Sequence, residues 1–219
     1  MSVLAIAHRA GNALPDLHSA VELGADVLEA DVHHWRGRLE IRHAKALGPL
    51  PWHYDAGALT PISTSQLLLD ELLDALHRTS TLMLDLKDPG SVGLHTAEAV
   101  HLRVPEKPVL VCSRWWPGLH AFHGRSWARP ILTARNRAEL FRLRHRVRRS
   151  PPYGVSVHRS LLTPAVVAEL HEQVERILTW PVNDHEALDQ VLRAGVSGVI
   201  SDEPEVLRSV LELPGRKTS

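Results

Sequence analysis

The sequence predicts an α/β fold, a (β/α)8 TIM barrel, and three observations support this prediction. Short runs rich in Val, Ile and Leu recur eight times along the 219 residues, and helix-like segments lie between them. Strands that are apolar on both faces and alternate with helices pair in parallel. Eight such units are the number that closes a TIM barrel.

The predicted elements follow one another in a regular order. The strand candidates span 3–9, 26–33, 81–87, 108–114, 129–134, 153–158, 176–182 and 195–201. The helical patterns span 12–23, 64–78, 92–102, 116–122, 136–147, 163–174, 184–193 and 204–212. Helix start signals support the last three helices, with capping residues at Thr163, at Asn183-Asp184 and at Asp202.

One segment departs from the alternation, and we expect it to be an insertion after the second strand at about 34–62. Gly37, between Arg36 and Arg38, predicts a hairpin turn that leads into a strand extension, RLEIRH. The Pro- and Gly-rich residues 48–61 are typical of a loop over the mouth of the barrel. Because the sequence contains no linker, we expect residues 1–219 to form a single domain.

Composition narrows the choice of partners and compartment. Lys+Arg and Asp+Glu number 25 each, so the formal net charge is zero, which argues against a mainly electrostatic nucleic-acid or membrane binder. Cys112 is the single cysteine, so a reducing cytoplasm fits. The apolar run at the start is too short for a signal peptide or a membrane span. We therefore expect a cytoplasmic protein without stable membrane insertion, and its oligomeric state is not predicted.

Three carboxylates lie toward the ends of two adjacent predicted strands. Glu29 and Asp31 share one face of the second strand because alternate side chains of a strand point the same way, and Asp85 lies near the end of the third. Two buried like charges are very costly unless a cation lies between them. Oxygen ligands without cysteine favour a hard cation such as Mg²⁺, Ca²⁺ or Mn²⁺ over zinc. An amphipathic strand with one wet face is the alternative.

Two histidines and two permanent cations are expected near these acids. His8 ends the first strand and His43 ends the hairpin extension. A histidine pair beside a divalent metal commonly provides the general base and general acid for cleavage of a phosphate ester. Arg9 and Lys87 are suited to bind phosphate oxygens, and simple pairing with the carboxylates is the alternative for both. Trp180 ends the seventh predicted strand.

Six segments in this order and at this spacing resemble the glycerophosphodiester phosphodiesterase family, TIM-barrel enzymes related to the sphingomyelinase D-like phospholipases: AHRAGN, GADVLEADV, LEIRH, LMLDLK, LTWPVND and GVSGVISDEP. The resemblance spans residues 5–204. It implies metal-assisted hydrolysis of glycerophosphodiesters to glycerol 3-phosphate and an alcohol, with a small-molecule or lysolipid phosphodiester as substrate. The site residues that it implies are His8 and His43 as catalytic pair, Glu29, Asp31 and Asp85 as ligands of one Mg²⁺ or Ca²⁺, Arg9 and Lys87 for the phosphate, and Trp180 in the substrate pocket.

Two positions depart from the family pattern. Gly11 stands where the family has a glutamate, next to Asn12 on the family's asparagine, and Ala44 follows His43 where an aspartate is usual. These changes leave the implied metal ligands and histidines in place. They fall in loops that line the predicted pocket, so they bear on the substrate rather than on the chemistry.

Two alternative functions remain open. A phospholipase D-like enzyme that acts on lysophospholipids and gives a cyclic phosphate is favoured by the Trp115-Trp116 pair and by Asp85, which replaces the usual glutamate of the diesterases. A catalytically silent phosphodiester-binding protein is favoured by the changes at Gly11 and Ala44.

Overall fold

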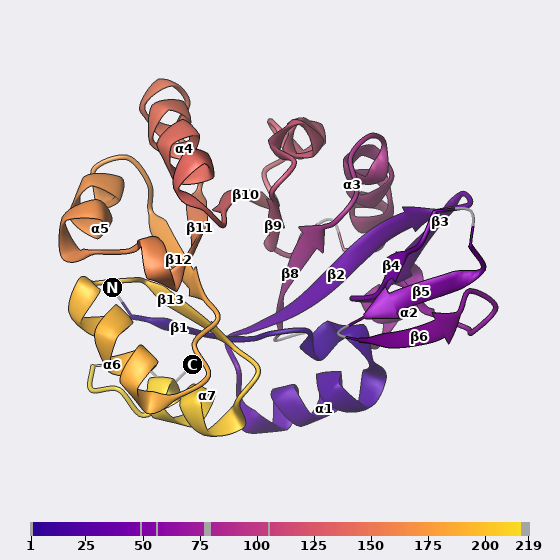
Figure 1. The fold of residues 1–219 in the computed structure, drawn as a ribbon, viewed down its shortest axis with the longest axis horizontal. Helices are drawn as coiled ribbons and strands as arrows, with labels where there is room; N and C mark the ends of the chain where they lie inside the picture. The colour runs from indigo at the N-terminus through magenta and orange to yellow at the C-terminus, as the bar shows by residue number, and fades with distance from the viewer. Residues whose placement is uncertain (1, 49, 56, 77–79, 105, 216–219) are drawn as a thin grey trace.

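The computed structural model describes residues 2–48, 50–55, 57–76, 80–104 and 106–215. Within them, parallel strands form a closed barrel in the order β1, β2, β8, β9, β10, β11, β12 and β13, and β13 pairs back to β1 (Figure 1). The predicted (β/α)8 fold is therefore confirmed. The barrel strands are β1 Leu4–Ala7, β2 Val27–Trp35, β8 Thr81–Leu86, β9 Val109–Ser113, β10 Ala128–Ala134, β11 Gly154–His158, β12 Arg176–Trp180 and β13 Gly198–Ser201.

Helices surround the barrel, as the alternating pattern predicts. They are η1 Ala10–Asn12, α1 Leu14–Leu23, α2 Leu69–Ala75, α3 Val92–Arg103, η2 Trp116–Phe122, α4 Arg137–Arg149, η3 Arg159–Leu161, α5 Pro164–His171, α6 His185–Ala194 and α7 Pro204–Leu211. The helix predicted at 64–78 begins only at Leu69, because β7 (Leu67–Leu68) precedes it, and its expected end at 77–78 lies outside the described residues. No helix in the described part of the chain has the length and apolarity that a membrane crossing requires.

The predicted helix starts are correct at two of three positions. The side chain of Thr163 accepts a hydrogen bond from the Val166 N–H, and that of Asp184 accepts one from the Ala187 N–H. The expectation that Asp202 starts the last helix is wrong. The residue before α7 is Glu203, which makes no side-chain cap, and the Asp202 carboxylate binds His8 instead.

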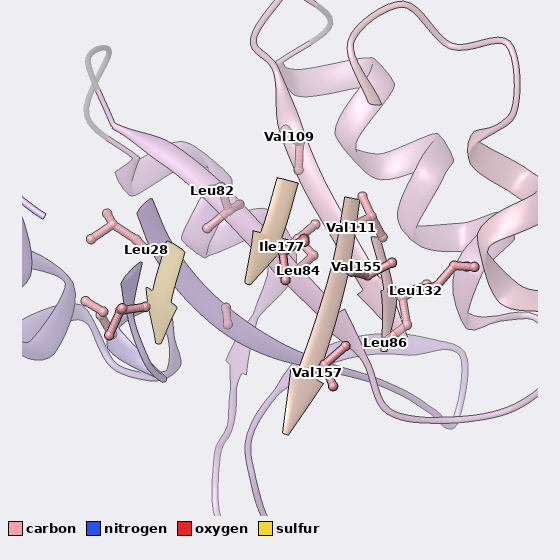
Figure 2. Packing of buried hydrophobic residues seen from close by; sticks show 14 of the residues in the cluster. Leu28, Leu82, Leu84, Leu86, Val109, Val111, Leu132, Val155, Val157 and Ile177 are labelled. Carbon is pink, nitrogen blue, oxygen red and sulfur yellow. The ribbon is translucent and has the colours of Figure 1, made fainter. Parts of the chain in front are cut away.

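The apolar core has two layers. The larger layer fills the space between the strands and the helices, and Figure 2 shows Leu28, Leu84, Val111 and Val155 in it. The smaller layer is a buried cluster with residues from seven of the barrel strands: Ile6, Val27, Met83, Leu110, Cys112, Ile131, Leu178 and Ile200. Because strand side chains alternate, the face of β2 that carries Val27 in this second cluster also carries Glu29 and Asp31.

The hairpin after the second barrel strand is present where the sequence predicts it. β2 continues to Trp35, and the chain turns at Gly37, whose φ of 78° is a conformation that glycine adopts readily. β3 (Arg38–Ile41) then pairs antiparallel with the outer half of β2. The hairpin carries the chain to His43, which follows β3 by two residues.

The loop predicted at 48–61 is wrong. β5 (Trp52–Asp55) and β6 (Ala58–Pro61) lie there, and with β4 (Lys45–Ala46) they form a three-stranded antiparallel sheet. The prolines and glycines of this segment flank or end its strands, which is where such residues are compatible with a sheet. We call these three strands the β4–β6 sheet.

Candidate active site

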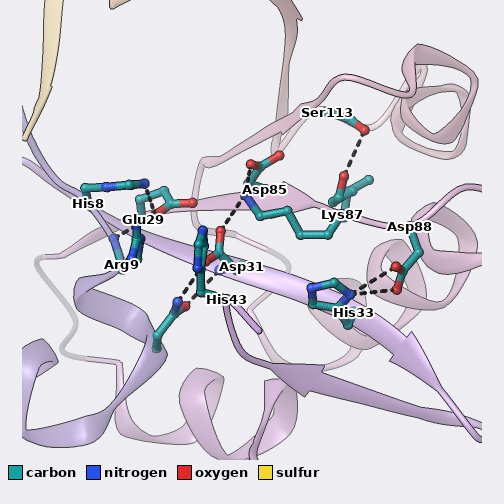
Figure 3. Close-up of polar contacts among 12 residues, drawn as sticks. His8, Arg9, Glu29, Asp31, His33, His43, Asp85, Lys87, Asp88 and Ser113 are labelled. Atoms are coloured by element: carbon teal, nitrogen blue, oxygen red, sulfur yellow. Dashed lines mark hydrogen bonds and ion pairs between the residues drawn. The ribbon is translucent and has the colours of Figure 1, made fainter. Parts of the chain in front are cut away.

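Three carboxylates converge at the mouth, the end of the barrel where the strands reach their carboxyl ends (Figure 3). Asp31 on β2 lies directly opposite Asp85 on β8, and Glu29 precedes Asp31 on the same face. One oxygen from each of the three carboxylates lies within 4.8 Å of the other two. Glu29 and Asp31 are only 3% and 0% exposed, so the alternative of a wet strand face is wrong.

The loop between β1 and α1 holds two of these acids in place. The Asn12 side chain donates to Asp31 Oδ2 at 2.8 Å, and its Oδ1 accepts the Asp31 N–H at 2.9 Å. The Arg9 N–H donates to Glu29 Oε2 at 2.7 Å from a backbone with φ of 56°, a left-handed conformation that is uncommon for a non-glycine residue. A Cβ on Gly11 would lie 2.7 Å from the Ala30 Cβ, so the loop needs glycine there to lie this close to β2.

The electrostatics of the cluster favour an added cation. Burial, and then the charge of Asp31, raise the pKa of Glu29 well above its ordinary value. Burial works in the same direction on Asp31, but Lys87 and Asn12 outweigh it and lower the Asp31 pKa. Burial alone would lower the pKa of Lys87, yet the surrounding acids raise it, Asp85 first among them. One ammonium thus faces three carboxylates, and the residual negative charge and oxygen-only donors fit a hard divalent cation.

Each of the two predicted catalytic histidines lies beside a carboxylate. His8 Nδ1 lies 2.8 Å from Asp202 Oδ1, and its Nε2 lies 4.0 Å from Glu29 Oε2. His43 Nδ1 lies 2.6 Å from Asp55 Oδ1. The hydrogen bond from His8 lowers the pKa of Asp202 to about 2, so this carboxylate is ionised at neutral pH and can only accept the bond.

The predicted phosphate-binding cations behave differently from each other. Lys87 Nζ lies 2.6 Å from Asp31 Oδ1 and also contacts Asp85, so pairing with the acids, the alternative for this lysine, is what the structure contains. Arg9 contacts Glu29 through its backbone. Its side-chain Nε is buried and has no hydrogen-bond partner among the described residues.

The predicted pocket aromatic, Trp180, ends β12 and packs edge-on against His158, with 5.2 Å between ring centroids. Of the tryptophan pair after β9, Trp116 donates its Nε1–H to the Thr133 carbonyl, whereas Trp115 is 50% exposed. His33 shares the inward face of β2 and binds the Asp88 carboxylate at 3.0 Å (Figure 3).

Three residues of this site were missed by the sequence-based prediction: Asn12, Asp55 and Asp202. Asp202 directly follows the last barrel strand, so the rule that drew attention to His8, a polar residue at a strand end, also applies to it. Asn12 matches an asparagine of the family pattern, although no role followed from that match. No sequence pattern indicated Asp55 as a site residue, because it lies in the segment that was predicted to be a loop.

Comparisons with known proteins concern the fold and one stretch of the sequence. The model of the glycerophosphoryl diester phosphodiesterase family matches residues 176–205, which include β12, α6 and β13. No curated protein matches the chain.

Solved structures share the fold over nearly the whole chain. A glycerophosphodiester phosphodiesterase from Thermotoga maritima is 19% identical with a TM-score of 0.77, covering 96% of this chain and 99% of its own. An Oleispira antarctica phosphodiesterase in complex with the product sn-glycerol-3-phosphate is 21% identical with a TM-score of 0.76, covering 97% of each chain. A glycerophosphodiester phosphodiesterase from Parabacteroides distasonis is 19% identical with a TM-score of 0.74, covering 96% of this chain and 97% of its own.

The resemblance indicated by the sequence motifs is thereby confirmed. This chain resembles, in its fold and in its C-terminal sequence, the glycerophosphodiester phosphodiesterases, a family of phosphoric diester hydrolases.

Proposed function

We propose that this chain is a divalent-metal-dependent phosphodiesterase that hydrolyses glycerophosphodiesters to glycerol 3-phosphate and an alcohol. The observation that carries this proposal is the cluster of three carboxylates, two of them buried and the third partly buried, together with two histidines that each bind a carboxylate of their own. The family match and the product named for the Oleispira antarctica structure support the substrate class.

Glu29, Asp31 and Asp85 are the residues that would hold the cation, as one Mg²⁺ or Ca²⁺. Ligand oxygens about 2.0–2.6 Å from such an ion lie within about 5 Å of one another, which is compatible with the 4.8 Å limit of this cluster. When bound, the cation supplies Lewis-acid stabilisation of the charge that develops on the phosphate oxygens. Asn12 and the Arg9 N–H keep two of the three acids in position for this task.

His8 and His43 exchange protons with the substrate in this proposal. Both use Nδ1 to bind a carboxylate, which leaves Nε2 for the substrate. One imidazole accepts at Nε2 the proton of the substrate hydroxyl that attacks phosphorus, and the other donates a proton from Nε2 to the oxygen of the leaving alcohol. Water then opens the resulting cyclic phosphate to glycerol 3-phosphate, with the two imidazoles returning these protons. Such general acid and base catalysis typically contributes about 10²–10⁴-fold to the rate.

Three further residues bind the substrate in this proposal. Lys87, whose pKa the surrounding acids raise, keeps its positive charge at neutral pH and attracts phosphate oxygens. Arg9 contributes its guanidinium, and Trp180 lines the pocket for the alcohol. Arg9 is supported by its buried Nε, which still lacks a hydrogen-bond partner among the described residues.

The direct test is hydrolysis of glycerophosphocholine, glycerophosphoethanolamine and bis(p-nitrophenyl)phosphate, with EDTA and after Mg²⁺ or Ca²⁺ is added back. We expect activity to vanish in chelator and to fall at least about 100-fold in His8→Ala and His43→Ala. His95→Ala is the matched control, because His95 lies on α3 and contacts none of the proposed catalytic residues in the described contacts. Activity retained in chelator or in His8→Ala would contradict the proposal, and tight binding without turnover would favour the silent binding protein.

A phospholipase D-like reaction on lysophospholipids is the second candidate, favoured by the exposed Trp115 and by Asp85 in the acid cluster. Phosphorus NMR of the products distinguishes the two reactions. A cyclic phosphate that persists after the substrate is consumed indicates the second candidate, and glycerol 3-phosphate indicates the first.

A further inference from the structure

His43 lies outside the barrel strands, on the connection that follows β3. Its side chain is 36% exposed, so packing alone leaves its ring orientation weakly defined. The described contact that orients it is the 2.6 Å hydrogen bond between its Nδ1 and Asp55 Oδ1. Ala44, the next residue, has no side-chain acceptor for this bond.

Asp55 reaches His43 because of the way β5 is built. Along β5 the side chains alternate, so His53 and Asp55 share one face, and Trp52 and Tyr54 share the other. His53 is 1% exposed, whereas Trp52 and Tyr54 are both exposed. The β4–β6 sheet therefore turns the face that carries His53 and Asp55 toward the protein.

The face of the β4–β6 sheet that carries His53 and Asp55 lies near charged residues of the β2–β3 hairpin. Burial lowers the pKa of His53, and Arg42, Glu40 and His33 also act on it, so these groups from β2, β3 and the connection after β3 lie near the His53 ring. Asp55 lies at the end of β5, where it pairs with Ala58 of β6. The position of the Asp55 carboxylate is thus set by the β4–β6 sheet and not by the barrel.

We propose that Asp55 is a positioning residue for His43 and that the β4–β6 sheet carries it to the mouth of the barrel. This inference rests on the proposed function, in which His43 transfers a proton. An ionised carboxylate can only accept, so it keeps the proton of the neutral ring on Nδ1 and leaves the lone pair on Nε2. Asp202 binds His8 through the same ring nitrogen, although it comes from the end of β13 rather than from an inserted sheet.

Asp55→Asn is the sharpest test, because the amide keeps the shape of the carboxylate but can donate to Nδ1 and so favour the wrong tautomer. We expect kcat to fall at least tenfold while KM changes less than twofold, since the group acts on proton transfer and not on substrate binding. Tyr54→Phe is the matched control on the same strand, because its side chain is exposed on the opposite face, and it should keep the wild-type kcat.

A double-mutant cycle separates positioning from a structural effect. If Asp55 acts through His43, Asp55→Asn adds no further loss in a His43→Ala background. An equal loss in both backgrounds would overturn the inference, as would a wild-type kcat for Asp55→Asn when His43→Ala is impaired.

Proton NMR can test the role of Asp55 even if the protein has no phosphodiesterase activity. Proton NMR of wild type and Tyr54→Phe should contain the downfield signal of a carboxylate-bound His43 imidazole N–H, and Asp55→Asn should lack it. Its absence from the wild type would contradict the role of Asp55 by itself. Wild-type protein that lacks phosphodiesterase activity but shows this signal would contradict only the proposed function.

Discussion

Asp202 orients His8 in the same way, and its removal gives a prediction at the scale of one residue. Asp202→Asn keeps the size of the side chain but weakens the hold on the His8 ring, so we expect kcat for glycerophosphocholine to fall at least about tenfold. Glu205→Gln is the control, because Glu205 lies three residues further on, is exposed and pairs only with Arg208 in the described ion pairs. Equal activity of the two variants would contradict the role of Asp202.

The same carboxylate predicts a pH dependence of stability. The pKa of Asp202 is lowered to about 2 by His8, below its ordinary value of about 3.9. A lowered pKa means that the ionised group stabilises the folded chain above about pH 4, and that this contribution is lost as the pH falls toward 2. The side chain is 36% exposed, so solvent screens the pair and the effect is modest.

Urea denaturation of wild type and Asp202→Asn checks this prediction. We expect the difference in unfolding free energy between the two proteins to be largest near pH 5 and to shrink steadily toward pH 3. A difference that stays constant over this range would show that the Asp202 charge does not contribute to stability.

The positions of the acids could be predicted from the sequence, because the two-residue repeat of a strand places Glu29 and Asp31 on one face. The roles of these acids stay predictions. Asp202 follows a barrel strand as His8 does, but its pairing with His8 could not be predicted, because 194 residues separate the two and the contact requires the barrel to close. His43 and Asp55 are only 12 residues apart, but their contact depends on a sheet that the sequence does not indicate.

At the scale of the elements, the inserted segment is the largest difference between prediction and structure. The β4–β6 sheet has short strands, and its prolines and glycines are dense enough to suggest a loop. A three-stranded sheet of this size buries little apolar surface, so its alternation is weak: His53 and Asp55 face inward where a larger sheet would place Val or Ile. Asp55 binds His43 from this sheet, and a hydrophobic pattern in the sequence cannot indicate such a polar contact.

The packing of α3 against η2 gives a prediction at this scale. A Cβ added to Gly93, in the first turn of α3, would lie 2.0 Å from the carbonyl oxygen of Gly118 in η2, so Gly93→Ala must push the two elements apart. Overpacking of this kind typically costs about 1–3 kcal/mol of unfolding free energy. Gly118→Ala is the matched control, because its added Cβ has no heavy-atom neighbour nearer than 3.8 Å.

Urea denaturation, analysed with one m-value for all proteins, compares the unfolding free energies of these two variants with that of the wild type. We expect Gly93→Ala to unfold at a clearly lower urea concentration than the wild type, and Gly118→Ala to lie within about 0.5 kcal/mol of it. If both variants were equally stable, the close contact between α3 and η2 would not limit the packing.

At the scale of the whole molecule, the barrel could be predicted because its signal is repeated. Each strand candidate is rich in Val, Ile or Leu, and an error of three residues at an end, as at β13, leaves the order of strands unchanged. The closed barrel also explains why acids from β2 and β8 meet: parallel strands with aligned register bring Asp31 opposite Asp85. Burial, and then repulsion from the charge of Asp31, raise the pKa of Glu29, so bringing these acids together costs folding free energy.

Thermal unfolding of the whole protein tests whether a cation relieves this repulsion. Chelator-treated protein should gain about 2.7 kcal/mol when Mg²⁺ or Ca²⁺ is present at about 100 times its Kd, because the folded state alone contains the assembled site. For a chain of this size that gain corresponds to a rise in Tm of about 5–10 °C. Glu98→Gln, on α3, should keep the full rise.

The variant Glu29→Gln should separate the effect of metal binding on Tm from the stability of the metal-free fold. The amide removes one buried charge without changing the shape of the side chain, so without metal we expect this variant to be at least as stable as the wild type. It should also lose most of the rise in Tm on adding metal, because a neutral ligand has replaced a carboxylate. A full rise in Glu29→Gln would mean that the cation binds elsewhere, and no rise in the wild type would mean that the three acids bind no divalent cation.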